Sequence, residues 1–203
     1  MIAASGGNAS LSRRWWRRAQ HAADASGDSR LSAHVAGQRA VHALYADGSP
    51  EQALALAKHC LAITSAPCAG RMHALAAAAK SSAVLDRRKH AEGTLAMLER
   101  EFERLPRDVT NEKVAAGGWA EERLHHARSY AAAFVPVAGG DAARAAALRL
   151  YPAGAWRGPA QIKLHVALAE RAEVAPILAP LSDAQRSDRS VRSVIALADA
   201  NRG

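Results

Sequence analysis

The chain has 203 residues, of which 49% are apolar and only 4% aromatic, and its formal net charge is +8. About a quarter of the residues are Ala, and Arg supplies most of the positive charge because only five of the 27 basic residues are Lys. Ala, Arg and Leu are strong helix formers, whereas the β-branched and aromatic residues that strands favour are scarce. The composition therefore excludes sheet-based folds and predicts an all-α protein that can bury a sizeable core.

The cysteine content and the length of the apolar runs indicate the cellular compartment of the protein. Only Cys60 and Cys68 are present, too few for a disulfide framework and typical of a reducing environment. Residues 1–7 lack the basic and apolar regions of a signal peptide. No apolar run reaches the roughly 18 residues that a membrane-spanning helix needs. We therefore expect a cytoplasmic protein that does not enter a membrane.

Helix-breaking residues recur along the chain and divide it into segments of helical length. Apolar residues within the segments recur at helical spacing; Leu95, Leu98 and Phe102, for example, are three and four positions apart. We expect residues 1–9 to be disordered and residues 106–118 to form a long loop. Helices are predicted, in chain order, over residues 11–25, 30–46, 51–64, 68–85, 89–105, 120–137, 141–150, 157–171, 174–181 and 189–200.

A short spacing pattern, a turn residue followed five positions later by Ala, occurs three times: at Gly48 and Ala53, at Asp86 and Ala91, and at Gly140 and Ala145. The pattern is typical of a helical hairpin, in which the turn residue ends one helix and the small Ala lets the partner helix pass close by. Such thin hairpins must stack on one another to bury their apolar faces. We therefore predict one domain over residues 10–203, a tetratricopeptide-like solenoid of helical hairpins.

Three stretches of the sequence resemble a known family. They are residues 13–28, which begin Arg-Arg-Trp-Trp-Arg, residues 104–110, which read Arg-Leu-Pro-Arg-Asp-Val-Thr, and residues 118–130, which begin Gly-Trp-Ala-Glu-Glu-Arg. All three are similar to the tetratricopeptide-like repeat region of actinobacterial helix-turn-helix transcriptional regulators of the xenobiotic-response-element type. The resemblance implies a region that senses a ligand or partner and mediates self-association. In that family a separate helix-turn-helix domain binds DNA. No such pattern precedes the repeats, so we expect no helix-turn-helix domain here and only indirect contact with nucleic acid.

The third of these stretches carries two carboxylate–imidazole pairs at a spacing of four residues. Such pairs could hold a metal or transfer protons, but no HExxH or Cys/His spacing accompanies them. We therefore expect no metal, no cofactor and no catalysis. The resemblance implies that this stretch lines a concave groove, where the residues predicted to contact a ligand or partner are Trp119, Glu122, His126 and Tyr130.

A basic and aromatic cluster lies near the start of the sequence. Adjacent Trp side chains point about 100° apart on a helix, so that one can be buried while the other is exposed. The cluster could bind nucleic acid, an anionic membrane surface or a partner helix, or it could be an ordinary first helix that packs one Trp against the second. The residues concerned are Arg13, Arg14, Trp15, Trp16, Arg17 and Arg18.

These observations favour a regulatory binding module over an enzyme. We expect the concave groove to bind a protein, a peptide or a small effector, and we expect that the chain could form a homodimer. The alternative is a nucleic-acid-binding protein that uses the basic Trp/Arg helix. The Gly pairs at residues 117–118 and 139–140 lack the pattern of a phosphate-binding loop, and no nucleophile motif is present.

Overall fold

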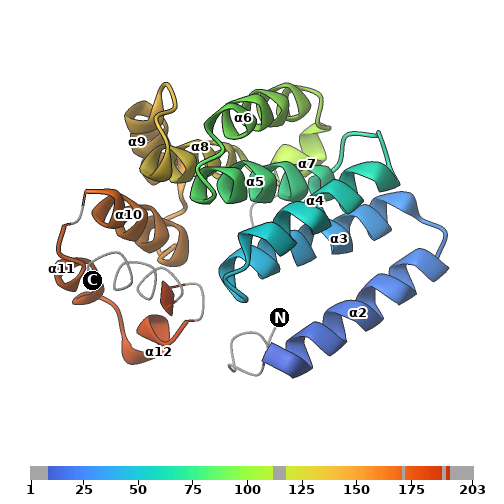
Figure 1. Ribbon diagram of the computed structural model, residues 1–203, viewed down its shortest axis with the longest axis horizontal. Helices are drawn as coiled ribbons and strands as arrows, with labels where there is room; N and C mark the ends of the chain where they lie inside the picture. Colours follow the sequence, from blue (N-terminus) through green and yellow to red (C-terminus); the bar gives the residue numbers. More distant parts are fainter. Residues whose placement is uncertain (1–8, 112–117, 171, 189–190, 193–203) are drawn as a thin grey trace.

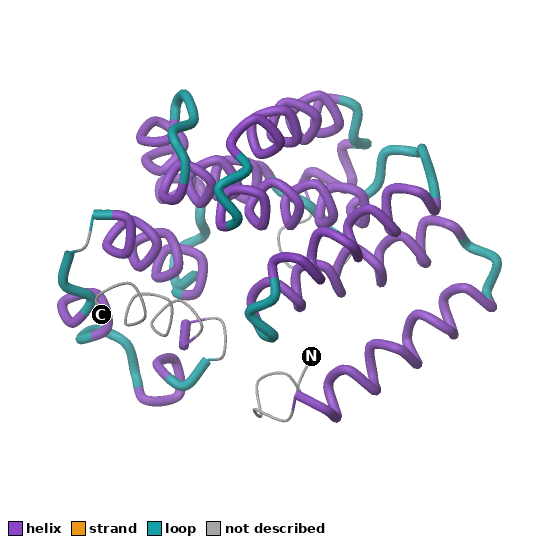
Figure 2. The backbone as a smooth tube through the Cα atoms, in the orientation of Figure 1, coloured by secondary structure: helices purple, strands orange, loops and turns teal. Residues whose placement is uncertain are grey.

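The computed structural model describes residues 9–111, 118–170, 172–188 and 191–192. Within these ranges every regular element is a helix and no strand is present, which confirms the all-α prediction (Figures 1 and 2). In chain order the helices are α2 (Ala9–Ala25), α3 (Ser29–Tyr45), α4 (Pro50–Ile63), α5 (Ala69–Val84), α6 (Arg88–Glu103), α7 (Arg107–Asn111), α8 (Glu121–Phe134), α9 (Gly140–Leu150), α10 (Arg157–Ala169), α11 (Ala175–Leu178) and α12 (Asp183–Arg186).

The predicted helices from residue 11 to residue 150 agree with the structure to within a few residues. The differences lie in the connections: α7 occupies part of the predicted loop over residues 106–118, α11 is shorter than expected, and α12 was not predicted. Of the residues expected to be disordered, Ala9 belongs to α2 and residues 1–8 lie outside the described residues. The predicted helix over residues 189–200 falls almost entirely outside them as well.

Local chemistry accounts for several helix ends. The Asp28 carboxylate accepts hydrogen bonds from the backbone N–H groups of Arg30 and Leu31, at 2.8 and 3.2 Å, and so caps the start of α3. Pro50 occupies the first turn of α4, where its missing N–H costs nothing. Gly139 precedes α9 with a φ of 74°, a left-handed conformation that glycine adopts without strain.

Four helices form an inner series in which each packs against the next, namely α3, α5, α8 and α10. Each inner helix also packs against the helix that follows it, so that α4, α6 and α9 cover the series from one side (Figure 1). The α2 helix packs against α3 (Figure 1). Every residue of α5 from Ala69 to Ala83 is buried, which makes α5 the central helix of the fold.

Close helix approach is possible because the facing residues are small. A Cβ atom added at Gly70 of α5 would overlap the backbone of Ala33 on α3, and one added at Gly37 of α3 would overlap the Gly70 carbonyl. The core around this crossing is built largely from Ala, with Cys60 among its members. A second cluster, which contains Met72, Leu95 and other large side chains, joins α5, α6 and α8. The high Ala content thus serves helix packing as well as helix formation.

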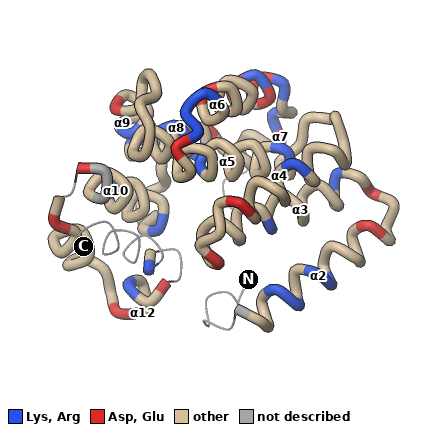
Figure 3. Tube along the Cα trace, viewed as in Figure 1, with Lys and Arg blue, Asp and Glu red and all other residues tan. Residues whose placement is uncertain are grey.

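Two general features of the described part of the chain complete this picture. None of its helices is long and apolar enough to cross a membrane. Basic and acidic residues are distributed over many helices, with basic residues along α2 and an acidic group near the turn that follows it (Figure 3).

Candidate functional site

The residues predicted to line a groove lie on α8 or directly before it. Glu122, His126 and Tyr130 are spaced by four residues and therefore share one face of the helix. All of them are buried, as is Trp119, whose side chain is only 1% exposed. Trp119 packs edge-on against Phe102 of α6, with ring centroids 6.0 Å apart, and belongs to the core. The structure thus places these residues inside the protein, and their contact with a ligand or partner stays a prediction.

Of the two predicted carboxylate–imidazole pairs, only one forms a direct contact. His125 Nε2 lies 3.4 Å from Glu121 Oε1 on the exposed side of α8. His126 instead shares a hydrogen bond of 2.7 Å, through Nδ1, with the hydroxyl of Tyr151. Within the described ranges, no three His, Cys, Asp or Glu side chains are grouped in a way that could hold a metal ion.

Tyr130 lies in a cluster of polar side chains that come from distant parts of the sequence. Lys80 of α5 donates a hydrogen bond of 3.0 Å to the hydroxyl of Tyr45 on α3. The Lys80 ammonium also lies over the Tyr45 and Tyr130 rings, 5.2 and 5.5 Å from their centroids. The ring of His165 on α10 lies against Tyr130, with centroids 4.1 Å apart. Each of the four inner helices therefore contributes one side chain; we call Tyr45, Lys80, Tyr130 and His165 the inner polar cluster.

Burial is the main cause of the shifted pKa values of the side chains in this cluster. Burial, and after it the positive charge of Arg123, lowers the pKa of Lys80 to about 7. Burial, together with the charge of Lys80, lowers the pKa of His165 to about 3. Burial also raises the pKa of both tyrosines, Tyr45 and Tyr130. At neutral pH the cluster therefore holds neutral rings beside one amine that is close to its titration midpoint.

Several buried polar atoms near the cluster lack a hydrogen-bond partner, namely Ser81 Oγ, His126 Nε2 and both ring nitrogens of His165. The backbone of Gln161 lies near His165 but without hydrogen-bond geometry. An unpaired buried polar atom costs stability, so such atoms are rare unless a ligand or water satisfies them. The inner polar cluster is therefore the candidate site for a small polar ligand.

A second row of polar side chains extends along the same helices. Gln38 of α3 and His73 of α5 are hydrogen-bonded at 3.0 Å, and the His34 and His73 rings meet edge-on with centroids 5.9 Å apart. Burial lowers the pKa of His34 and of His73, and the charge of Arg123 on α8 adds to both shifts. The positive charge of Arg123 therefore acts on groups in both rows of the inner helices.

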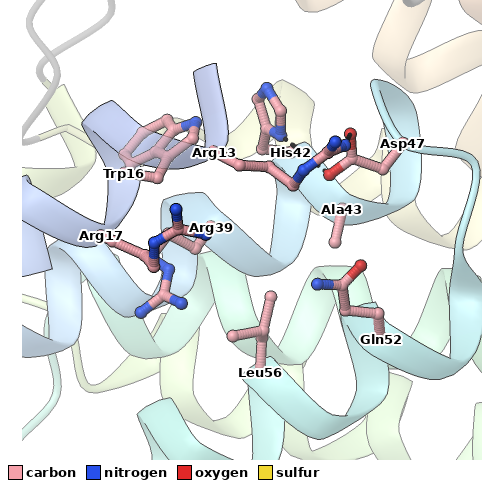
Figure 4. Close-up of a pocket in the computed structure, with 9 residues that line it drawn as sticks. All are labelled: Arg13, Trp16, Arg17, Arg39, His42, Ala43, Asp47, Gln52 and Leu56. Atoms are coloured by element: carbon pink, nitrogen blue, oxygen red, sulfur yellow. Dashed lines mark hydrogen bonds and ion pairs between the residues drawn. The ribbon is translucent and has the colours of Figure 1, made fainter. Parts of the chain in front are cut away.

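The basic cluster of α2 divides between the two sides of the helix. The ring of Trp16 packs edge-on against His42 of α3, with centroids 5.8 Å apart, whereas Trp15 is 53% exposed. The Arg18 guanidinium lies 5.6 Å from the centroid of the Trp15 ring. Arg13 Nη1 lies 3.4 Å from Asp47 Oδ1, next to a pocket that Arg17 also lines (Figure 4). Trp16 thus packs against α3, as the helical geometry allows, while Trp15 remains on the surface. Arg14, Arg17 and Arg18 are exposed as well.

One feature of the sequence points to the inner polar cluster. Lys80 is one of five Lys residues and directly follows four consecutive Ala residues in an apolar helix. A charge inside such a run is either functional or costly. Tyr45 and His165 carry no comparable local signal. Comparison of the chain with known protein families, curated proteins and solved structures finds no match.

Proposed function

We propose that this protein is a tetratricopeptide-like helical-repeat module that binds a small effector, a peptide or a protein on its inner helices. The contact pattern supports a repeat, because each inner helix packs against the next one and against its own outer helix. Two hydrogen bonds between neighbouring inner helices, Gln38–His73 and Tyr45–Lys80, each span 35 residues. This separation is close to the 34-residue tetratricopeptide period.

The observation that carries the proposal is the polar character of the inner helices. Lys80 and several buried imidazoles lie there, the charge of Arg123 on α8 lowers the pKa of Lys80, His34 and His73, and two buried His side chains have ring nitrogens without a partner. Cationic groups and neutral imidazole nitrogens favour a ligand with carboxylate and hydroxyl groups. Binding such a ligand would satisfy the orphaned nitrogens and tighten the contacts between α5, α8 and α10. It would therefore favour one arrangement of the stacked helices over another.

This mechanism fits the sensor region of transcriptional regulators, which three stretches of the sequence resemble. In the proposed role the protein acts in the cytoplasm, self-associates or binds a partner, and carries out no catalysis. A change in helix packing at the inner polar cluster would be passed to that partner as a change in affinity.

The proposal is tested by thermal denaturation of the full chain with a panel of small carboxylic acids and acidic peptides. A compound that binds on the inner helices should raise the melting temperature of the wild type in a saturable way. The same compound should have a much weaker effect on Arg123→Gln. Arg88→Gln, which removes an exposed charge on α6, serves as the matched control and should respond like the wild type. If every active compound affects Arg123→Gln and the wild type equally, the proposed site is wrong.

A second candidate function, nucleic-acid binding, is favoured by the outer side of α2. There, Arg18 lies over the exposed ring of Trp15 and Arg14 is exposed as well, an arrangement suited to phosphate contact and base stacking. The test is a gel shift at low and moderate salt with Arg13, Arg14, Arg17 and Arg18 changed to Ala together. A matched control changes four exposed residues at a distance from α2, namely Arg87, Arg88, Arg100 and Arg104. Equal binding by both variants would contradict this function.

A further inference from the structure

A small pocket lies between α2, α3 and α4, apart from the inner polar cluster (Figure 4). Its volume is about 90 Å³, well above the roughly 10–15 Å³ that a cavity needs to hold one water molecule. Three guanidinium groups line it, from Arg13 and Arg17 of α2 and from Arg39 of α3. The Trp16 ring and the Gln52 amide line it as well. The pocket is thus a small polar hollow with three positive charges.

The Asp47 carboxylate, which also lines the pocket, neutralises only part of this positive charge. Asp47 Oδ1 lies 3.4 Å from Arg13 Nη1, and Asp47 Oδ2 lies 3.5 Å from His42 Nδ1. Among the described residues, no carboxylate lies within ion-pair distance of Arg17 or Arg39. Arg39 donates a long hydrogen bond of 3.4 Å to Gln20 Oε1. Within the described part of the chain, two of the three guanidinium groups therefore have no carboxylate within ion-pair distance.

The carboxylate of Asp24, which acts electrostatically on Arg39, is hydrogen-bonded to other side chains. It accepts hydrogen bonds from Gln20 Nε2 at 2.9 Å and from Ser32 Oγ at 2.7 Å. Burial lowers the pKa of Arg39; the charge of Asp24 opposes this shift, and the charge of Arg17 adds to it. Arg17 and Arg39, which both line the pocket, thus carry like charges that repel each other. An anion bound between them would relieve this repulsion.

We propose that Arg13, Arg17 and Arg39 form a binding pocket for a phosphate group. Guanidinium groups present their N–H donors as planar forks that match the oxygens of a phosphate, and charge-assisted hydrogen bonds of this kind are strong. The volume suits the phosphate group itself, so that the remainder of a phosphate ester would lie outside the pocket. The phosphate could belong to a small metabolite or to the backbone of a nucleic acid, since both present the same group.

The pocket is distinct from both proposed functional surfaces. The inner polar cluster lies on α3, α5, α8 and α10, and the exposed face of α2 carries Arg14, Trp15 and Arg18, none of which lines the pocket. The proposal therefore stands or fails separately from binding at the inner polar cluster. It shares Arg13 and Arg17 with the four-residue variant of the nucleic-acid test, so single variants of pocket residues are needed to test it.

The experiment titrates inorganic phosphate into the full chain at constant ionic strength and follows binding by calorimetry and by the melting temperature. The wild type should bind phosphate saturably at one site. Arg17→Gln and Arg39→Gln should each weaken binding by at least about tenfold, because each removes a charge-assisted contact. Arg30→Gln is the matched control, since it removes an exposed charge of the same kind from α3 outside the pocket, and it should bind like the wild type. Arg17 is exposed, so its variant tests the proposal even if Arg39→Gln disturbs folding.

Two results would overturn the proposal. One is the absence of saturable phosphate binding by the wild type. The other is an equal loss of binding in Arg30→Gln and Arg17→Gln, which would indicate a general effect of net charge. A competition arm with a short single-stranded oligonucleotide then identifies the source of the phosphate. Displacement of the oligonucleotide by inorganic phosphate, with the same dependence on Arg17, assigns the pocket to a nucleic-acid backbone, and independence assigns it to a small phosphate-bearing molecule.

Discussion

The ammonium of Lys80 on α5 donates a hydrogen bond of 3.0 Å to the hydroxyl of Tyr45 on α3, and it does so from inside the protein. The bond joins two inner helices directly and lies beside the Tyr130 ring of a third. It is surrounded by an Ala-rich core that provides no carboxylate ion-pair partner for Lys80 among the described residues. The protonation of one amine is therefore coupled to the packing of three helices.

This coupling predicts a pH-dependent stability. The pKa of Lys80 is about 7 in the folded protein and near its ordinary value of 10.5 when the chain is unfolded. Between these values the unfolded chain binds the extra proton, so the free energy of unfolding should rise with pH, by up to about 1.4 kcal/mol per pH unit. Urea denaturation from pH 7 to pH 8.5 measures this slope. Lys80→Met, which keeps the length of the side chain, should lose this contribution. The same slope in both proteins would show that Lys80 does not titrate in this range.

His165 is predicted to destabilise the protein in acid. Its pKa is lowered to about 3 in the folded state, whereas the unfolded chain takes up a proton near pH 6.5. Stability should therefore fall as the pH drops below 6.5. His165→Phe removes two unpaired nitrogens beside Tyr130 and Phe134, so we expect it to stabilise the protein by about 1 kcal/mol at pH 7 and by more at pH 5. Calorimetry at both pH values checks this, with the exposed His59→Gln as the control, and a destabilised His165→Phe would contradict it.

The crossing of α3 and α5 predicts opposite effects for two Gly→Ala changes. At Gly70 the added methyl group would overlap the backbone of Ala33, so Gly70→Ala should destabilise the protein by about 1–3 kcal/mol. At Gly93 of α6 an added Cβ would meet no atom within 4 Å. Gly93→Ala should therefore stabilise the protein by about 0.5–1 kcal/mol through helix propensity. Chemical denaturation of both variants provides the measurement, and similar values for the two would show that the helices separate easily.

The ion pair between Arg71 and Glu101 should contribute far more to stability than the one between Arg88 and Glu92. Arg71 contacts Glu101 at 3.1 Å, and it also donates to the backbone carbonyls of Thr64 and Leu61 from a buried position. Arg71→Gln removes a donor from these carbonyls and leaves the partly buried Glu101 carboxylate with only the exposed Arg104, at 3.7 Å, so we expect a loss of about 3 kcal/mol. Arg88 and Glu92 are exposed, and Arg88→Gln should change stability by less than about 0.5 kcal/mol. Unfolding curves that rank the two variants in the reverse order would refute this reading.

The sequence determined the elements of this protein whose formation depends on nearby residues. Turn residues such as Asp28 and Gly139, and the apolar spacing along α6, place the helix ends correctly because caps and helical periodicity act over a few positions. The 100° offset between Trp15 and Trp16 likewise predicted that one ring could pack inward while the other faces outward.

Only the tertiary structure decided which side chains meet. Tyr45, Lys80, Tyr130 and His165 lie on four different helices, and no local pattern in the sequence relates them. The burial of Glu122 and His126, and the pairing of His126 with Tyr151, also depend on how α8 packs against its neighbours. The three guanidinium groups of the pocket meet because α2 lies against α3. Local propensity sets where helices form, but the small residues at their crossings set how closely the helices approach. The close approach brings together the side chains of the inner polar cluster and of the pocket.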